Sequence, residues 1–173
     1  LGKAMGLRVI AGCSSQEKVD RCLAHGADAG IVYPSQPLDR SQQKALADEI
    51  KAAGGGGVDI VYDAVGGDYA EPAVRALNWE GRFLVIGFPA GIPALPLNLT
   101  LLKSCQIVGV FWGAFVMSRP EANAANLAEL FALYDAGTIK PHISARCPLE
   151  RAADAITELA ERRAEGKVVV TVP

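Results

Sequence analysis

The sequence predicts an α/β protein whose parallel β-sheet is doubly wound, with helices covering both faces. Two observations predict this fold class. Short apolar runs rich in β-branched residues, such as residues 58–63, alternate with longer segments of helical periodicity, such as residues 149–163. Strands separated by helices form right-handed parallel units, and near-continuous apolar strands are typical of sheets covered on both faces.

Three strands are expected in the first part of the chain, at residues 7–11, 31–33 and 58–63, with glycine or proline beside each of them. Ser15 follows the first strand, and its hydroxyl can accept a hydrogen bond from the first turn of a helix, so it is the expected N-cap. A polar helix over about residues 40–53 follows the second strand and ends at a run of glycines.

The same alternation continues to the end of the chain. The expected elements are, in order, a helix from Asp68, a strand at 82–86, a short helix near Asn98, a strand at 106–111, a helix at about 120–135, a strand at 143–146, a helix at 149–163 and a strand at 167–172. No internal repeat or linker interrupts the pattern, so one domain over residues 1–173 is expected.

Composition excludes several classes of protein. The chain has 173 residues and a formal net charge of −2, so it lacks the basic excess that drives binding to nucleic acid. No apolar run approaches the roughly 20 residues that cross a bilayer, so no membrane association is expected. The cysteines lie far apart in sequence without a Cys-x-x-Cys pair, which argues against a metal site and indicates reduced thiols in a cytoplasmic protein; they are Cys13, Cys22, Cys105 and Cys147.

Residues 1–6 resemble the last turns of a helix rather than the start of a domain. In a dinucleotide-binding fold, the helix before the second strand carries the cofactor's phosphates at its N-terminus. We therefore expect the first strand and its glycine-rich turn upstream of Leu1, so that the chain is an N-terminally truncated domain. The alternative is that residues 1–6 form a frayed leader.

The end of the first expected strand is the most informative position for function. An acidic residue there binds the ribose hydroxyls of NADH, whereas this chain has Ser14 and Ser15, with Lys18 one turn later. Hydroxyls, free amides near a helix start and a lysine make a suitable pocket for the 2′-phosphate of NADPH. In the alternative interpretation, Ser15 is only a helix cap and Lys18 is a solvated surface residue.

Other candidate residues follow the ends of later strands, which line a single crevice in such a sheet. Tyr33 could contact the adenosine or be an ordinary strand-end tyrosine. Two glycine-containing turns would let the backbone approach a ligand closely; they comprise Val65, Gly66 and Gly67, and then Gly87, Phe88 and Pro89. An aromatic segment could wall a nicotinamide pocket, form a subunit contact or belong to the core; it contains Val110, Phe111 and Trp112.

As an ordered set, these segments resemble the quinone oxidoreductase branch of the medium-chain dehydrogenases and reductases. The segments that carry the resemblance are residues 9–15 with Lys18, residues 25–28, 58–67, 81–87 and 166–169. The resemblance covers essentially the whole chain and implies a Rossmann domain, accompanied in the full enzyme by a GroES-like catalytic domain that this chain lacks. It further implies hydride transfer from NADPH to a quinone or other activated alkene without zinc.

The resemblance also implies roles for individual residues. Ser14, Lys18 and Tyr33 would hold the 2′-phosphate end, and Val65, Gly66 and Gly67 would border the ribose and pyrophosphate. Gly87, Phe88, Pro89, Val110, Phe111 and Trp112 would frame the nicotinamide, and Lys167 would close over the phosphates. The strand around residues 107–111 would pair with its copy in a homodimer.

Two departures from the family pattern limit the expected activity. The glycine-rich loop and the substrate-side residues are absent from this sequence, so the chain alone should bind NADPH weakly and catalyse nothing, and no catalytic or metal-binding residue is assigned. An enoyl-thioester reductase of the same superfamily is the nearest alternative. A non-catalytic module that binds NADPH or serves a structural role is the alternative from another class, and a zinc alcohol dehydrogenase is disfavoured because it would more often have an acid at the strand end.

Overall fold

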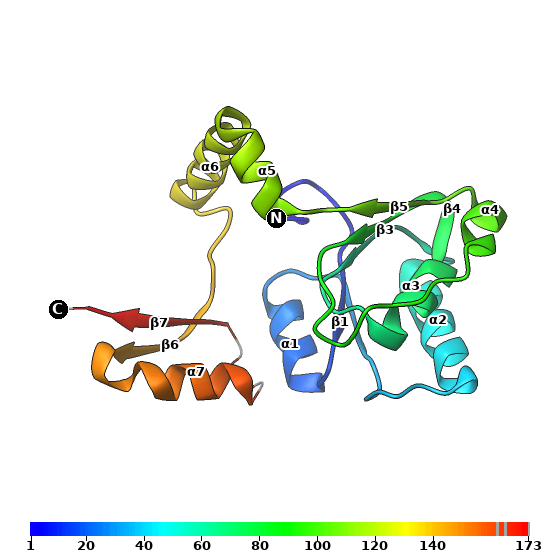
Figure 1. The fold of residues 1–173 in the computed structure, drawn as a ribbon, viewed down its shortest axis with the longest axis horizontal. Coiled ribbons are helices and arrows are strands. Elements are labelled where there is room, and N and C mark those ends of the chain that lie inside the picture. The colour runs from blue at the N-terminus through cyan, green and yellow to red at the C-terminus, as the bar shows by residue number, and fades with distance from the viewer. Residues whose placement is uncertain (162, 165, 173) are drawn as a thin grey trace. The chain divides into compact units, whose positions relative to one another are not determined.

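The computed structural model describes residues 1–161, 163–164 and 166–172. Residues Gly2–Pro120 form one compact unit, and the chain from Glu121 onward forms a second, to which Leu1 is also assigned (Figure 1). Among the described residues, no helix is both long and apolar enough to cross a membrane.

The first unit begins with a parallel pair of strands, β1 (Ile10–Cys13) and β2 (Ala29–Val32), joined by helix α1 (Gln16–Ala24). Val19 of α1 is buried against this pair, and Gly30 makes the close approach possible, because a Cβ at residue 30 would collide with the Val19 side chain. Helix α2 (Arg40–Gly54) follows β2. Its capping box, formed by Asp39 and Gln42, fixes its first turn.

A second parallel sheet follows in the same unit, with strand order β3-β4-β5 (Figure 1). Its elements are β3 (Val58–Asp63), the 3₁₀ turn η1 (Gly67–Tyr69), α3 (Ala70–Arg75), β4 (Leu77–Val85), α4 (Asn98–Lys103), β5 (Gln106–Gly109) and α5 (Trp112–Ser118). Phe83 of β4 and Val74 of α3 are fully buried, and they form a core with Leu77 and Leu99. This core fixes the positions of the loops that leave β3 and β4.

The second unit contains a further parallel pair, β6 (Ile143–Pro148) and β7 (Lys167–Thr171). Between these strands lie the 3₁₀ turn η2 (Leu149–Arg151) and helix α7 (Ala152–Ala160), and before them lies the long helix α6 (Pro120–Asp135). Gly137 has a φ of +71° just beyond α6, as expected for the left-handed position that follows a helix end.

The predicted fold class and parallel pairing are confirmed, while several boundaries differ. The first strand lies at residues 10–13 instead of 7–11, and β4 begins at Leu77 instead of residue 82, because Leu77 is buried and pairs with Val58. The strand predicted at 106–111 ends at Gly109, and α5 follows it. The helix predicted at 149–163 ends at Ala160, and its residue 162 lies outside the described residues.

Residues Gly2–Leu7 have the hydrogen-bond pattern of a helix C-terminus. The amide of Gly6 donates to the carbonyl of Lys3 and the amide of Leu7 to the carbonyl of Gly2, each at 2.9 Å. Gly6 has a φ of +76°. These two bonds and the left-handed glycine make a Schellman motif, which agrees with the helix end predicted from the sequence.

Candidate functional site

The end of β1 and the start of α1 bring together two serine hydroxyls, a lysine and the N-terminus of a helix. Ser15 is the N-cap of α1, with extended φ and ψ of −152° and 157°, and its hydroxyl accepts a bond from the amide of Lys18 at 3.4 Å. The Lys18 Nζ donates to the Ser14 hydroxyl, also at 3.4 Å. We call these three residues, Ser14, Ser15 and Lys18, the cradle.

At the cradle, the Lys18 ammonium and the N-terminus of α1 favour an anion, whereas Glu17 in the same helical turn opposes one. The amides of the first turn of α1 point toward it and carry the positive end of the helix dipole. Ser14 is exposed, and the side-chain partner of Lys18 is a hydroxyl rather than a carboxylate. The two alternatives for Ser15 are compatible, because its capping bond to the Lys18 amide uses neither the exposed Ser14 hydroxyl nor the Lys18 ammonium.

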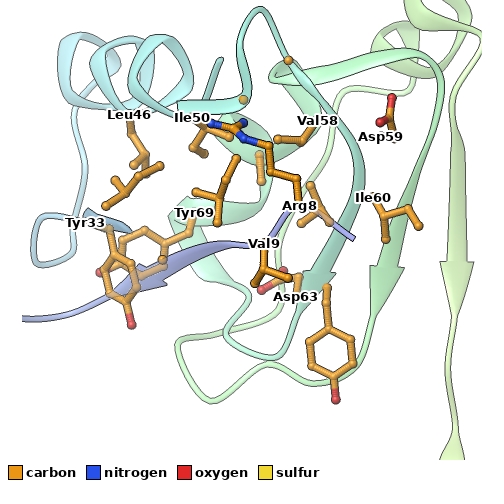
Figure 2. A pocket seen from close by; sticks show the side chains of 18 of the residues that line it. Arg8, Val9, Tyr33, Leu46, Ile50, Val58, Asp59, Ile60, Asp63 and Tyr69 are labelled. Atoms are coloured by element: carbon orange, nitrogen blue, oxygen red, sulfur yellow. The ribbon is translucent and has the colours of Figure 1, made fainter. Parts of the chain in front are cut away.

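Tyr33 lies beside the end of β1, where its amide donates to the carbonyl of Cys13 at 2.9 Å. Its ring packs against Tyr69, with centroids 4.6 Å apart, and the Tyr69 hydroxyl donates to the carbonyl of Pro34 at 2.8 Å. Figure 2 shows both rings beside the cavity described below. Tyr33 therefore has a packing role in addition to any contact with a ligand.

The turn after β3 contains the two glycines noted in the sequence, but Gly66 is buried and the turn's backbone amides have partners inside the protein. The Asp63 carboxylate accepts bonds from the amides of Val65 and Gly66, each at 2.9 Å, and so fixes the turn. Gly66 has φ and ψ of 73° and −148°, a region that only glycine adopts readily. A Cβ at Gly66 would also lie 2.7 Å from the carbonyl oxygen of Gly91, so glycine is required twice at this position.

The loop after β4 lies against this turn. The amide of Ala90 donates to the carbonyl of Val65 at 2.9 Å, and the amide of Gly67 donates to that of Gly91 at 2.7 Å. Gln36 joins a third loop to them, since its side chain donates to the carbonyl of Ala90 at 3.0 Å and accepts from the amide of Asp68 at 2.8 Å. The structure thus brings the loops after β2, β3 and β4 together.

Sequence reasoning missed the bridging role of Gln36 and the turn-forming role of Asp63. Gln36 lies in a loop without periodicity, so its partners more than 30 residues away leave no local signal. Asp63 could have been recognised, because a carboxylate at the end of a strand, two residues before a backbone amide, is the arrangement of an Asx turn.

The remaining predicted site residues lie in several different elements, and the structure does not bring them all together. Gly87, Phe88 and Pro89 lie in the loop after β4, and Val110 continues the ladder beyond β5 through its amide bond to Val85 at 2.9 Å. Phe111 is 79% exposed, and Trp112 stacks on Phe115 of its own helix, with centroids 5.1 Å apart. Lys167 begins β7 in the second unit, so its role stays a prediction.

A cavity of about 500 Å³ separates β1 from β3 in the first unit. Figure 2 shows the apolar side chains that make up most of its walls: Val9 before β1, Val58 and Ile60 from β3, and Leu46 and Ile50 from α2. The charged residues Arg8, Asp59 and Asp63 also line it. Among the described strands, β1 pairs only with β2, and β3 pairs only with β4. One backbone edge of each strand is therefore unpaired, and we call the cavity between them the slot.

The described residues contain no cluster of three or more histidine, cysteine, aspartate or glutamate side chains that could hold a metal ion. All four cysteines are free thiols. The polar groups at the ends of the strands include the hydroxyls and the ammonium of the cradle, which suit a phosphorylated ligand, and the Asp63 carboxylate, which bonds to the amides of its own turn.

Comparisons with known proteins identify the family to which this chain is similar. The model of a family described as zinc-binding dehydrogenase matches residues 25–170. Quinone oxidoreductase-like protein 2 of Bos taurus is 33% identical over 166 residues, which are 95% of this chain and 46% of that protein. Prostaglandin reductase-3 of Mus musculus is 30% identical over 190 residues, which cover 100% of this chain and 48% of that protein.

A solved structure shares the fold. The crystal structure of Escherichia coli quinone oxidoreductase complexed with NADPH superposes with a TM-score of 0.80 and 26% identity, covering 98% of this chain and 51% of that chain. The present chain spans about half the length of the curated relatives it matches.

Proposed function

Because the chain belongs to the zinc-binding dehydrogenase family, as a quinone oxidoreductase-like member of the medium-chain dehydrogenase and reductase superfamily, we propose that it is the nucleotide-binding part of an NADPH-dependent oxidoreductase. The observation that carries this proposal is the cradle. It presents an ammonium and an exposed hydroxyl at the strand end where NADH-binding domains place an acid. NADPH supplies a hydride when it is bound, and this chain's residues hold and orient it.

Each part of the site has a proposed task. Ser14 and Lys18 bind the 2′-phosphate, with Tyr33 beside them. The turn at Val65, Gly66 and Gly67 borders the ribose and pyrophosphate, and its amides, which bond to Asp63 and Gly91, hold the turn in shape. The nicotinamide end is framed by residues that follow β4 and β5, namely Gly87, Phe88, Pro89, Val110, Phe111 and Trp112.

The slot supports the proposal that a further strand completes this domain in a longer protein. Dinucleotide-binding sheets have the strand order 3-2-1-4-5-6. The observed orders β2-β1 and β3-β4-β5 are the two halves of that sheet when its first strand is left out. A strand in the slot would pair with both free edges and cover the apolar walls around Val58 and Leu46. Its turn would supply the glycine-rich phosphate contacts.

The proposed reaction is hydride transfer from NADPH to a quinone or other activated alkene, without zinc. Likeness to proteins named quinone oxidoreductase supports a quinone, and likeness to prostaglandin reductase-3 supports a reductase of another activated alkene, such as an enoyl thioester. Oxidation of NADPH by the longer protein with each substrate class distinguishes the two. Tight NADPH binding without turnover would favour a non-catalytic binding module.

The cradle is tested by Lys18→Ala. Loss of a charge-assisted bond of about 1.5–3 kcal/mol should weaken NADPH binding about tenfold to a hundredfold, while NADH binding stays nearly unchanged. Both affinities are measured by calorimetry on the parent and variant proteins. Lys44→Ala is the control, because Lys44 is 80% exposed and pairs with Asp48 on α2. Equal losses for both cofactors would contradict the proposed 2′-phosphate site.

A further inference from the structure

Two cysteines next to the cradle in the sequence, Cys13 and Cys22, lie side by side in the structure. Cys13 is the last residue of β1 and Cys22 lies on α1, and their Sγ atoms are 3.8 Å apart. Both side chains are half-buried. Cys13 immediately precedes Ser14 of the cradle, and Cys22 lies one helical turn after Lys18, so the thiol pair and the cradle share the same two elements.

The geometry is close to that needed for a disulfide. The two sulfur atoms need to approach from 3.8 Å to about 2.0 Å, a movement of the size that side-chain rotation with a small helix shift provides. Among the described residues, neither of the other two cysteines has a second cysteine sulfur beside it. Cys105 is buried in the core beside Leu99, and Cys147 belongs to β6 of the second unit.

We propose that Cys13 and Cys22 form an oxidation site whose disulfide alters the cradle and weakens binding of the cofactor's 2′-phosphate. The oxidant is a hydroperoxide. One cysteine sulfur attacks the peroxide oxygen, which yields a sulfenic acid and releases water or an alcohol. The second thiol then displaces the sulfenic oxygen as water, so two thiols lose two electrons and two protons in total.

The surroundings of Cys13 make its reaction with an oxidant slow. Burial first, and then the neighbouring Cys22, raise the pKa of the Cys13 thiol to about 11, while Lys18 opposes the change. At neutral pH Cys13 is therefore held as a thiol, the unreactive form. Formation of the disulfide is expected to be slow and to require peroxide in excess.

The proposed coupling between the disulfide and the cradle follows from the way that Cys13 is held in the sheet. Cys13 is fixed by the parallel ladder, where it pairs with Val32, and its carbonyl accepts the amide of Tyr33 at 2.9 Å. Closing the disulfide therefore draws α1 toward β1 and displaces Lys18 relative to Ser14. This part rests on the proposed function. By linkage, bound NADPH must oppose disulfide formation to the same extent.

The disulfide is tested by mass spectrometry, independently of cofactor binding. After treatment with hydrogen peroxide, the expected product is a linked peptide containing Cys13 and Cys22, lighter by two hydrogens and restored by a thiol reductant. Cys22→Ser should abolish it, and Cys147→Ser should leave it unchanged. Separate oxidation of Cys13 and Cys22 to sulfinic acids, or pairing with Cys105 or Cys147, would overturn the proposal.

The coupling is tested by NADPH titration of reduced and oxidised protein. We expect affinity to fall at least about fivefold on oxidation, with no change in Cys22→Ser, and we expect saturating NADPH to slow formation of the linked peptide. A disulfide that leaves NADPH affinity unchanged would overturn the coupling. Failure of the reduced longer protein to bind NADPH would overturn the proposed function, while the mass measurement would still decide the disulfide.

Discussion

At the scale of single residues, Asp28 joins three segments of the first unit. Its carboxylate accepts two bonds from Lys3 Nζ, both at 2.8 Å, and one from the amide of Val9 at 2.7 Å. It also directly precedes β2. The bond from Lys3, followed by that from Val9, holds the pKa of the Asp28 carboxyl below its ordinary value. Ionised Asp28 therefore stabilises the folded state.

Asp28→Asn should lower the stability of the protein at neutral pH. Because the pKa is lower in the folded state, the contribution of ionised Asp28 is fully present above about pH 5 and disappears as the pH falls through the folded-state pKa. The difference in urea midpoint between parent and variant should therefore be clear at pH 7 and much smaller near pH 3.

Asp48→Asn is the matched control for this effect. Asp48 also pairs with lysines, and its pKa is also lowered, first of all by Lys44, but its partners Lys44 and Lys51 lie on the same helix. Exposed pairs within one helix contribute little to stability. An equal change in midpoint for both variants would show that joining distant segments adds nothing at Asp28.

Gly66 shows how a single residue can determine the shape of a site. Its backbone angles exclude other residues, and the carbonyl of Gly91 occupies the space that a Cβ would need. Gly55 also has a positive φ, of 76°, but nothing lies within 4 Å of its Cβ position. The glycine at Gly66 thus serves the contact between two loops, whereas the one at Gly55 only ends a helix.

At the scale of elements, the end of β5 shows that an apolar run in the sequence can overestimate the length of a strand. Residues 106–111 are apolar enough for a strand throughout, yet the strand ends at Gly109 and a helix begins at Trp112. The amide of Phe115 bonds to the carbonyl of Phe111, and Trp112 stacks on Phe115, which favours the helical turn. A short apolar run cannot by itself separate strand from buried helix.

Strand β5 has an unpaired edge among the described strands, which supports the proposed homodimer through residues 107–111. The amide of Val110 bonds to β4, so by the alternation of a parallel strand the amide of Ile107 points toward the free edge. An edge of this kind pairs readily with a second copy.

Ile107→Pro should therefore convert the proposed dimer to a monomer while leaving the β4–β5 bonds in place, because proline removes only the outward amide. Light scattering after gel filtration measures the mass. Val108→Pro is the contrasting variant, since its amide points toward β4 and its loss should lower thermal stability instead. A dimer that survives Ile107→Pro would exclude pairing through this edge.

At the scale of the whole molecule, the slot divides the first unit. The walls are mainly apolar, with Arg8, Asp59 and Asp63 also lining them, and the cavity of about 500 Å³ runs between two strands that each have a free edge. Unpaired backbone groups beside apolar surface are costly unless another strand or water satisfies them. A strand that fills the slot would thus join the two sheets and place its own end beside the cradle and the turn at Gly66.

Amide exchange tests this proposal. In the 173-residue chain, peptides covering β1 and β3 should exchange quickly on their free edges, and they should gain protection in a longer protein that includes an upstream strand. Peptides covering β4 around Phe83 are the internal control, because β4 has a partner on both sides. Unchanged exchange at β1 and β3 in the longer protein would contradict the filled slot.

The sequence by itself determined the fold class, the parallel pairing, the cap at Ser15 and the boundaries of β3 and α6. These features are local, because periodicity, capping and glycine punctuation act within a few residues of the chain. It also identified the cradle, whose residues lie within one turn of each other.

Only the tertiary structure decided which distant groups meet. The bridge from Gln36 to the loops after β3 and β4, the contact of Tyr33 with Tyr69, and the thiol pair of Cys13 and Cys22 all depend on how strands and helices pack. The same is true of the early start of β4, where burial of Leu77 extends the strand beyond its apolar run. Packing joins residues that no local pattern relates, so these contacts leave no signal in a single sequence.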